Sequence, residues 1–240
     1  MTPLVLSLFP GIGLLDMAFE AEGFCVVRGP DLLWGGDIRQ FHPPVGKFDG
    51  IIGGPPCQAF SPLRNFNPAI DRYGNMIPEF ERVVGEARPA WFLMENVQAA
   101  PEPVVPGYAV TARLFNNRWA GGEQNRVRRL CFGSRGPTRP FAICGEALEP
   151  YAWKAAVTAA HGGERRTHFK TATGGAIQRY TVAEALAAHG LPADFFGDTC
   201  PLTAIGKLRA LAQGVPLPMG RAVARAVKRA MCPGLCEAAP

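Results

Sequence analysis

The sequence lacks any apolar run long enough to cross a lipid bilayer. Its first nine residues also lack the basic segment and the small-residue cleavage site of a secretory signal peptide. We therefore expect a cytoplasmic protein with no membrane partner. No repeat of long period is present either, which argues against a solenoid or propeller.

Regular cysteine pairing is absent as well. The chain has seven cysteines, an odd number without regular spacing, and this pattern suits reduced thiols in a cytoplasm. Cys232 and Cys236 supply only half of a zinc site, because no second pair lies at a matching spacing. We therefore expect no metal.

The composition that is present predicts a globular chain. Apolar residues make up 48% and charged residues 19%, and 240 residues suffice for one domain with an insertion. The net charge of +5 is unevenly distributed, because residues 118–179 contain eleven Lys/Arg against four Glu, a local balance of +7, and the remainder sums to −2. A local basic patch indicates phosphate binding, although a solvated surface can have the same composition.

The segment at residues 53–61 reads Gly-Gly-Pro-Pro-Cys-Gln-Ala-Phe-Ser and is the most informative in the chain. It follows an apolar run at residues 48–52 that predicts a strand. Two prolines exclude a regular helix, so Cys57 is expected in a rigid turn at the strand's carboxyl end, where open α/β sheets bind ligands. A lone cysteine is usually a small buried hydrophobic residue, whereas a nucleophile needs such a mounting.

A nucleotide-binding βα unit is predicted at the N-terminus. An apolar run at residues 4–9 leads into Phe-Pro-Gly-Ile-Gly at residues 9–13, and apolar residues then recur at helical spacing. A second apolar run precedes Asp31, which lies 22 positions after Phe9; an acid about 20 residues beyond the glycine turn accepts ribose hydroxyls in dinucleotide folds. Asp37 could accept from an adenine amino group. Either acid could instead cap a turn.

Two further predicted strands carry charged side chains. The apolar run at residues 91–94 ends at Glu95, which is either an acid–base candidate or a solvated strand terminus. Residues 124–129 read Gln-Asn-Arg-Val-Arg-Arg, and alternation places Gln124, Arg126 and Arg128 on one face.

Together these motifs resemble the DNA (cytosine-5) methyltransferases. They occur in the order Phe-x-Gly-x-Gly, Gly-Gly-Pro-Pro-Cys-Gln, Glu-Asn-Val and Gln-x-Arg-x-Arg. Residues 179–184 and 214–216 are similar to the last two motifs of that family. The resemblance covers nearly the whole chain except about residues 134–178.

The resemblance implies a doubly wound, mostly parallel α/β sheet of the class I methyltransferase type, in a prokaryotic or phage-type enzyme. Residues 1–133 and 179–240 would form the catalytic domain, and residues 134–178 a small basic target-recognition insertion. In the family, a full strand unit separates the acids that correspond to Asp31 and Asp37. Only five residues lie between them here, so we expect one edge of the sheet to be trimmed.

The implied chemistry explains the residue types. The Cys57 thiolate would add to carbon 6 of a flipped cytosine, so that carbon 5 can attack the methyl group of S-adenosylmethionine. Glu95 would hold the exocyclic amine and ring nitrogen 3, Arg128 would bind the carbonyl oxygen at carbon 2, and Arg126 would help to order the site. Nearby arginines and backbone N–H groups are expected to lower the pKa of Cys57.

Two further sets of contacts are expected. S-adenosylmethionine would be bound by Phe9, Gly11, Ile12, Gly13, Asp31, Asp37, Ile38, Met76, Gln213 and Val215. Double-stranded DNA would be bound by Gln58, Ser61, Arg64, Gln124, Arg165, Arg166 and Lys170.

Two alternatives remain beside DNA methylation. The same fold can methylate structured RNA such as tRNA, because fold alone does not specify a substrate. A homologue that binds DNA without catalysis is the second alternative, and the intact Cys57, Glu95 and Arg128 argue against it. A companion restriction enzyme is neither indicated nor excluded by the sequence.

Overall fold

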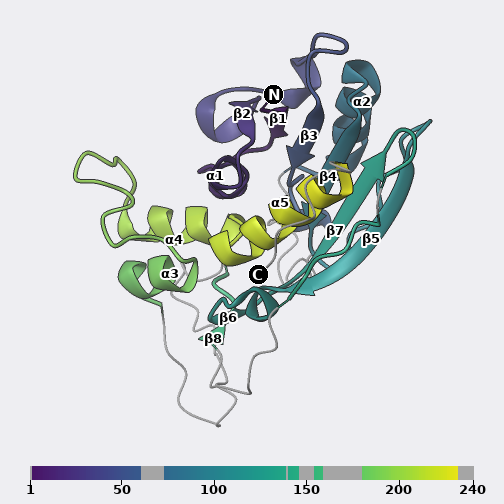
Figure 1. The fold of residues 1–240 in the computed structure, drawn as a ribbon. Coiled ribbons are helices and arrows are strands. Elements are labelled where there is room, and N and C mark those ends of the chain that lie inside the picture. The colour runs from purple at the N-terminus through teal and green to yellow at the C-terminus, as the bar shows by residue number, and fades with distance from the viewer. Residues whose placement is uncertain (1, 61–72, 139, 146–153, 159–179, 232–240) are drawn as a thin grey trace.

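The computed structural model describes residues 2–60, 73–138, 140–145, 154–158 and 180–231. Its centre is a six-stranded sheet with the strand order β2-β1-β3-β4-β7-β5 (Figure 1). The strands are β1 Leu4–Leu8, β2 Cys25–Arg28, β3 Gly50–Gly53, β4 Trp91–Asn96, β5 Ala109–Asn116 and β7 Val127–Ser134. The first four strands in this order are parallel, and β7 runs antiparallel to both β4 and β5.

The remaining regular elements surround this sheet. A second sheet pairs β6 Gln124–Asn125 with β8 Lys154–Ala155. The helices are α1 Leu14–Ala21, α2 Ile77–Ala87, α3 Val182–Ala188, α4 Ala204–Gln213 and α5 Leu217–Met231. Short 3₁₀ turns are η1 Leu32–Trp34, η2 Ile38–Gln40, η3 Gln58–Phe60 and η6 Asn117–Ala120.

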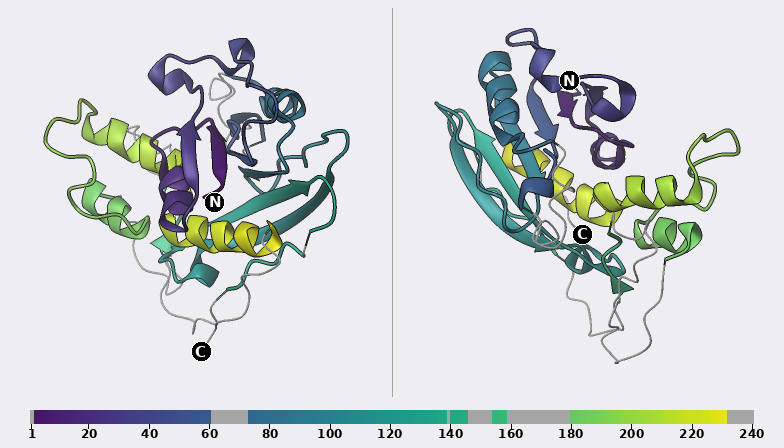
Figure 2. Two further views of the ribbon diagram at one scale, coloured as in Figure 1. Left: turned by 45° about the horizontal axis from the view of Figure 1, so that its top comes forward. Right: turned by 180° about the vertical axis from the view of Figure 1, so that it is seen from behind.

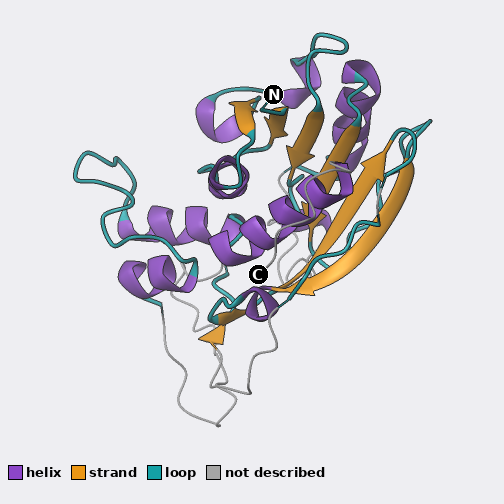
Figure 3. Ribbon diagram, viewed as in Figure 1, coloured by secondary structure: helices purple, strands orange, loops and turns teal. Residues whose placement is uncertain are grey.

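Apolar strand residues alternate between the two faces of the sheet, and helices cover both. On one face Val5 and Ile52 belong to the cluster that includes Phe19 of α1 and Val223 of α5. On the other face the alternate strand residues pack with α2, for example through Phe80. Figure 3 shows these helices against the strands. The predicted doubly wound, mostly parallel sheet is therefore confirmed.

A third apolar cluster joins α3 and α4 to this core. Leu186 of α3 and Leu211 of α4 pack with Leu14 and Val157, and Figure 2 shows both helices beside the sheet. Val157 lies in the expected insertion, and so does Phe141, which is buried in the cluster beneath α5. Phe141 and Val157 thus anchor described parts of the expected insertion to the core, and the division into domains stays a prediction.

Among the described residues no strand lies outside β2, as the expected trimming of one sheet edge requires. β2 pairs only with β1, so it is an edge strand. After β2 the chain forms the turns η1 and η2 before it enters β3. The segment between β2 and β3 is therefore held by side chains and turns instead of by a further strand.

Candidate active site

Cys57 lies in a turn that is fixed from two sides. β3 ends at Gly53, and the two prolines follow at the carboxyl edge of the sheet. The side-chain amide of Asn96, at the end of β4, donates to the carbonyl oxygen of Pro55 at 3.1 Å, and this bond is buried. The Phe60 N–H donates to the carbonyl oxygen of Cys57 at 3.0 Å and begins the η3 turn. This geometry matches the rigid mounting that the sequence predicts.

Glu95 and Arg128 form an ion pair beside this turn. They come from the neighbouring strands β4 and β7, and Arg128 Nε lies 2.9 Å from Glu95 Oε1. The Arg128 and Glu95 side chains are only 17% and 10% exposed, so water screens the pair weakly. A Cβ at Gly54 would lie 3.2 Å from Glu95 Oε2, so the lack of a side chain there lets the carboxylate approach the Pro-Pro-Cys turn.

The pKa of the Cys57 thiol is raised above its ordinary value. Burial is the largest cause, because it disfavours the thiolate, and the negative charge of Glu95 acts in the same direction. Arg128 and Arg126 lower the pKa, as expected from the sequence, but they do not outweigh burial. The expected net lowering is therefore wrong, and the thiol form is favoured.

Arg126 is buried and holds the C-terminal part of the site together. Its Nη1 donates to the carbonyl oxygen of Val157 at 3.1 Å, and its Nη2 donates to the carbonyl oxygens of Ala212 and Gly214 at 2.8 and 3.0 Å. Burial, reinforced by the charge of Arg128, lowers the pKa of Arg126 to about 9. Arg126 thus ties the basic strand to the turn between α4 and α5, which fits the expected ordering role.

The glycine turn after β1 is in place, and Asp31 lies against it. Asp31 Oδ2 accepts from the Gly11 N–H at 2.8 Å, and its Oδ1 accepts from the Leu33 N–H at 2.8 Å. Asp31 is therefore next to the turn, as a ribose acceptor must be, and it also caps η1. Trp34 was not predicted as a site residue, yet its indole N–H donates to the carbonyl oxygen of Gly11 at 2.8 Å.

Asp37 caps the η2 turn and is paired with Arg39. Its carboxylate accepts from the Arg39 backbone N–H at 3.0 Å and from the Arg39 guanidinium at 2.7–3.0 Å. The hydrogen bonds from Arg39 lower the pKa of Asp37 below its ordinary value. Ile38, which follows, is buried in the apolar cluster against which Phe9 also packs.

The other expected cofactor residues differ in exposure. Met76 is half-buried and precedes α2. Val215 is buried near α1 and α5, whereas Gln213 at the end of α4 is exposed. At Gly11, no atom lies within 4 Å of where a Cβ would be, which leaves open space beside the Asp31 carboxylate. An open glycine turn with a neighbouring carboxylate fits a nucleoside-bearing cofactor such as S-adenosylmethionine.

The residues expected to contact DNA fall into three groups. Gln58 is half-buried beside Cys57. Gln124 is fully buried, because its Nε2 donates to the carbonyl oxygen of Ala188 at 2.8 Å and its Oε1 accepts from the Val157 N–H at 3.3 Å. Its assignment to DNA binding is therefore wrong. Outside the described residues lie Ser61, Arg64, Arg165, Arg166 and Lys170.

Neither a membrane span nor a metal cluster occurs in the part of the chain that the structure describes. No helix there is long and apolar enough to span a membrane. The same residues also contain no group of three or more His, Cys, Asp or Glu side chains placed to hold a metal ion.

Comparison with known proteins agrees with this geometry. Residues 34–103 match the sequence model of the family described as C-5 cytosine-specific DNA methylase. The type II methyltransferase M.FnuDI of Fusobacterium nucleatum is 31% identical over 160 residues, which cover 55% of this chain and 46% of that protein. M.NgoPII of Neisseria gonorrhoeae is 30% identical over 162 residues, with 55% and 48% coverage. The chain thus spans about half the length of these curated relatives.

Solved structures show the same fold. The methyltransferase EhMeth of Entamoeba histolytica has a TM-score of 0.68 at 12% identity, with 95% of this chain and 98% of that chain covered. A putative DNA modification methyltransferase encoded within an E. coli prophage has a TM-score of 0.67 at 15% identity, with 95% and 99% coverage.

The doubly wound sheet and the glycine turn define a protein of the class I methyltransferase fold. Cys57 and Glu95 lie at the carboxyl ends of the parallel strands, and Arg128 lies at the same edge of the sheet, where the antiparallel strand β7 begins. Over residues 34–103 and over about half of the curated relatives, the chain is similar to the C5 cytosine methyltransferases.

Proposed function

We propose that this protein is a DNA (cytosine-5) methyltransferase that transfers a methyl group from S-adenosylmethionine to carbon 5 of a flipped cytosine. The observation that carries the proposal is the grouping of Cys57 with the Glu95–Arg128 ion pair at one edge of the sheet. Carbon 5 of cytosine is a weak nucleophile, and this group contains the side chains that can activate it.

Cys57 acts first in the proposed reaction. Its thiolate sulfur adds to carbon 6, and the electron pair of the 5,6 double bond shifts to carbon 5, where it is shared through carbon 4 with nitrogen 3, so that carbon 5 becomes nucleophilic. Because burial raises the pKa of Cys57, the neutral thiol must first give its proton to water as the cytosine enters. The target base must leave the duplex, since carbon 6 is shielded within the base stack.

Glu95 and Arg128 stabilise the charge that develops on the ring. The Glu95 carboxyl group holds ring nitrogen 3 with its proton and accepts from the exocyclic amine. Arg128 donates to the carbonyl oxygen at carbon 2 and, through Nε, keeps Glu95 in position at 2.9 Å. Such fixed donors and acceptors act strongly here because both side chains are largely shielded from water.

The cofactor is held along the glycine turn in this proposal. Asp31 and Asp37 accept from the ribose and the adenine, and Phe9, Ile38 and Val215 form the apolar wall. S-adenosylmethionine supplies an electrophilic methyl group when bound. After transfer, water takes the proton from carbon 5, the C–H electron pair re-forms the 5,6 double bond, and the Cys57 sulfur leaves carbon 6 as a thiolate. Nitrogen 3 returns its proton to Glu95, which restores the cytosine ring and the enzyme.

A fluorinated substrate tests this proposal. Fluorine at carbon 5 cannot leave as a cation, so the cycle should stop as a covalent adduct. The protein is incubated with S-adenosylmethionine and a duplex DNA pool that contains 5-fluorocytosine. A band stable to denaturing gels is expected, with peptide mapping to Cys57 and a large decrease in Cys57→Ser.

Control incubations with other substrates distinguish this function from an RNA methyltransferase and from a protein that only binds DNA. Fluorinated tRNA in place of DNA should give no adduct, and trapping of RNA alone would identify an RNA enzyme. A protein that only binds DNA would form no adduct with either substrate. Mapping of the adduct to Cys25, Cys131 or Cys200 would contradict the role of Cys57.

A further inference from the structure

The segment between β2 and β3 carries Asp37 and Ile38 but belongs to no strand. β2 is the edge of the sheet, so the main-chain hydrogen bonds of a further strand are not available to hold this segment. Its regular structure consists of the two 3₁₀ turns η1 and η2. Turns of this length are held weakly by their own hydrogen bonds, so the position of Asp37 must depend on other contacts.

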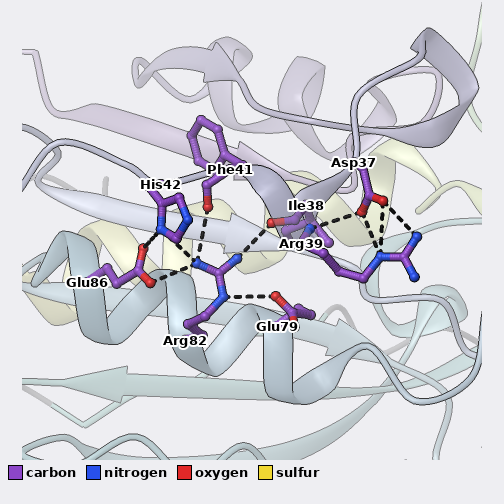
Figure 4. A network of polar contacts seen from close by, with 8 residues as sticks. All are labelled: Asp37, Ile38, Arg39, Phe41, His42, Glu79, Arg82 and Glu86. Atoms are coloured by element: carbon purple, nitrogen blue, oxygen red, sulfur yellow. Dashed lines mark hydrogen bonds and ion pairs between the residues drawn. The ribbon is translucent and has the colours of Figure 1, made fainter.

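Arg82 on α2 provides these contacts (Figure 4). Its Nη2 donates to the carbonyl oxygen of Ile38 at 2.7 Å, and its Nη1 donates to the carbonyl oxygen of Phe41 at 3.1 Å. One guanidinium thus binds both ends of the η2 turn. The fork geometry allows two carbonyl oxygens to be held at once, which a single ammonium group does less well.

Acidic side chains on the same helix hold the guanidinium in turn. Arg82 Nε lies 2.9 Å from Glu79 Oε2, and Arg82 Nη1 lies 2.8 Å from Glu86 Oε1. His42, just after the turn, lies 3.0 Å from Glu86. The Arg82 side chain is 27% exposed, so these bonds are made largely away from bulk water and fix its orientation.

The helix that carries Arg82 also begins next to another expected cofactor residue. Met76 immediately precedes α2, and the Asn75 side chain caps the helix by accepting from the Ile77 N–H at 3.0 Å. Arg82 therefore fixes the Asp37–Ile38 segment relative to the start of α2. Ile38 also lies in the apolar cluster that includes Ile77 and Phe80 of α2, and Arg82 adds directional polar bonds to this packing.

We propose that Arg82 is a positioning residue that sets recognition of the adenine edge by Asp37 and Ile38. This proposal rests on the proposed use of S-adenosylmethionine. Arg82 does not touch the cofactor; it acts through the two carbonyl groups that it holds. The trimmed sheet edge makes this side-chain link the substitute for a strand.

The test compares two ligands that differ only at the adenine edge. S-adenosylhomocysteine has an amino group at position 6 that can donate to Asp37, whereas S-inosylhomocysteine has an oxygen there and cannot donate from that position. Asp37 keeps its bonds from Arg39 with either ligand. Calorimetric titration of the unaltered protein should therefore give roughly 10- to 100-fold tighter binding of the adenosyl ligand, as expected for one hydrogen bond to a charged group. In Arg82→Met this preference should fall to about threefold, chiefly through weaker adenosyl binding.

Two other variants keep the test specific. Arg221→Met removes a cation whose partner Glu22 keeps a second ion pair with Arg225, so the preference should remain that of the unaltered protein. Arg82→Lys keeps the positive charge but lacks the forked guanidinium group. It should fold even if Arg82→Met does not, and its preference for the adenosyl ligand should also be reduced.

The outcomes distinguish the two proposals. Equal weakening of both ligands in Arg82→Met, with the preference unchanged, would assign Arg82 a purely structural role and overturn the inference. If Arg82→Lys preferred the adenosyl ligand as strongly as the unaltered protein does, the forked geometry of the guanidinium would have no role. Failure of the unaltered protein to bind S-adenosylhomocysteine would instead overturn the proposed function itself, and the positioning role of Arg82 with it.

Discussion

At the scale of single residues, the Glu95–Arg128 ion pair has a near duplicate that serves as a control. Arg129 Nη1 and Glu102 Oε1 also lie 2.9 Å apart, but Glu102 is 49% exposed and Glu95 is 10% exposed. Exposed pairs contribute little, whereas a shielded carboxylate can stabilise developing charge. The two carboxylates are thus equal in pair geometry and different in expected function.

We predict that Glu95→Gln lowers single-turnover methyl transfer by roughly 100-fold or more, because it removes charge stabilisation and proton transfer at nitrogen 3. Affinity for S-adenosylhomocysteine should barely change, and Glu102→Gln should have nearly unaltered rates. Abolished cofactor binding in Glu95→Gln, with little effect on the chemical step, would contradict the assignment.

At the scale of elements, His189 links α3 to the start of α5. Its Nδ1 lies 2.7 Å from the carbonyl oxygen of Ala185, and its own carbonyl oxygen accepts from the Leu217 N–H at 3.0 Å. Burial, together with the charge of Arg126, lowers the pKa of His189 from 6.5 to about 4. The folded protein therefore holds this imidazole neutral, whereas the unfolded chain binds a proton below pH 6.5.

This difference predicts acid sensitivity. Because the folded pKa is the lower one, the stabilisation is complete above pH 6.5 and is lost between pH 6.5 and about 4. The free energy of unfolding should fall by about 2 kcal/mol between pH 7 and pH 5 from this group alone. Urea titrations should show a smaller decrease in His189→Gln than in the unaltered protein. Parallel curves for the two proteins would exclude His189 as the source.

The sequence alone predicts some of the strands and site residues of this structure but not others. The strands within residues 48–58 and 91–95, and the side chains at their ends, are predictable from the sequence. Apolar runs, prolines and glycines determine the backbone locally, without distant contacts. The burial of Gln124 was missed because it depends on Ala188, which is 64 positions away. The raised pKa of Cys57 was missed for the same reason, since burial depends on the whole fold. The alternation of residues 124–128 predicts a shared face but not whether that face meets DNA or the core.

At the scale of the whole molecule, positive charge is concentrated in one stretch of the chain. Residues 118–179 carry a balance of +7, while the whole chain carries +5. A second group of cations lies on α5, where Arg221 and Arg225 pair with Glu22, and Lys228 donates to the Glu22 carbonyl oxygen. The two groups are alike in the sign of their charge but differ in their expected contact with phosphates.

This contrast gives a test of the DNA surface. Replacing Arg165, Arg166 and Lys170 with Gln should weaken DNA binding and reduce the slope of log affinity against log salt by about 0.9 for each phosphate that the protein no longer neutralises. Replacing Arg221, Arg225 and Lys228 with Gln removes the same net charge and should leave the slope nearly unchanged. An equal reduction of the slope in both triple variants would mean that net charge alone governs binding. An unaltered slope in the first variant would place its three residues away from DNA, because counterion release depends on local phosphate contacts.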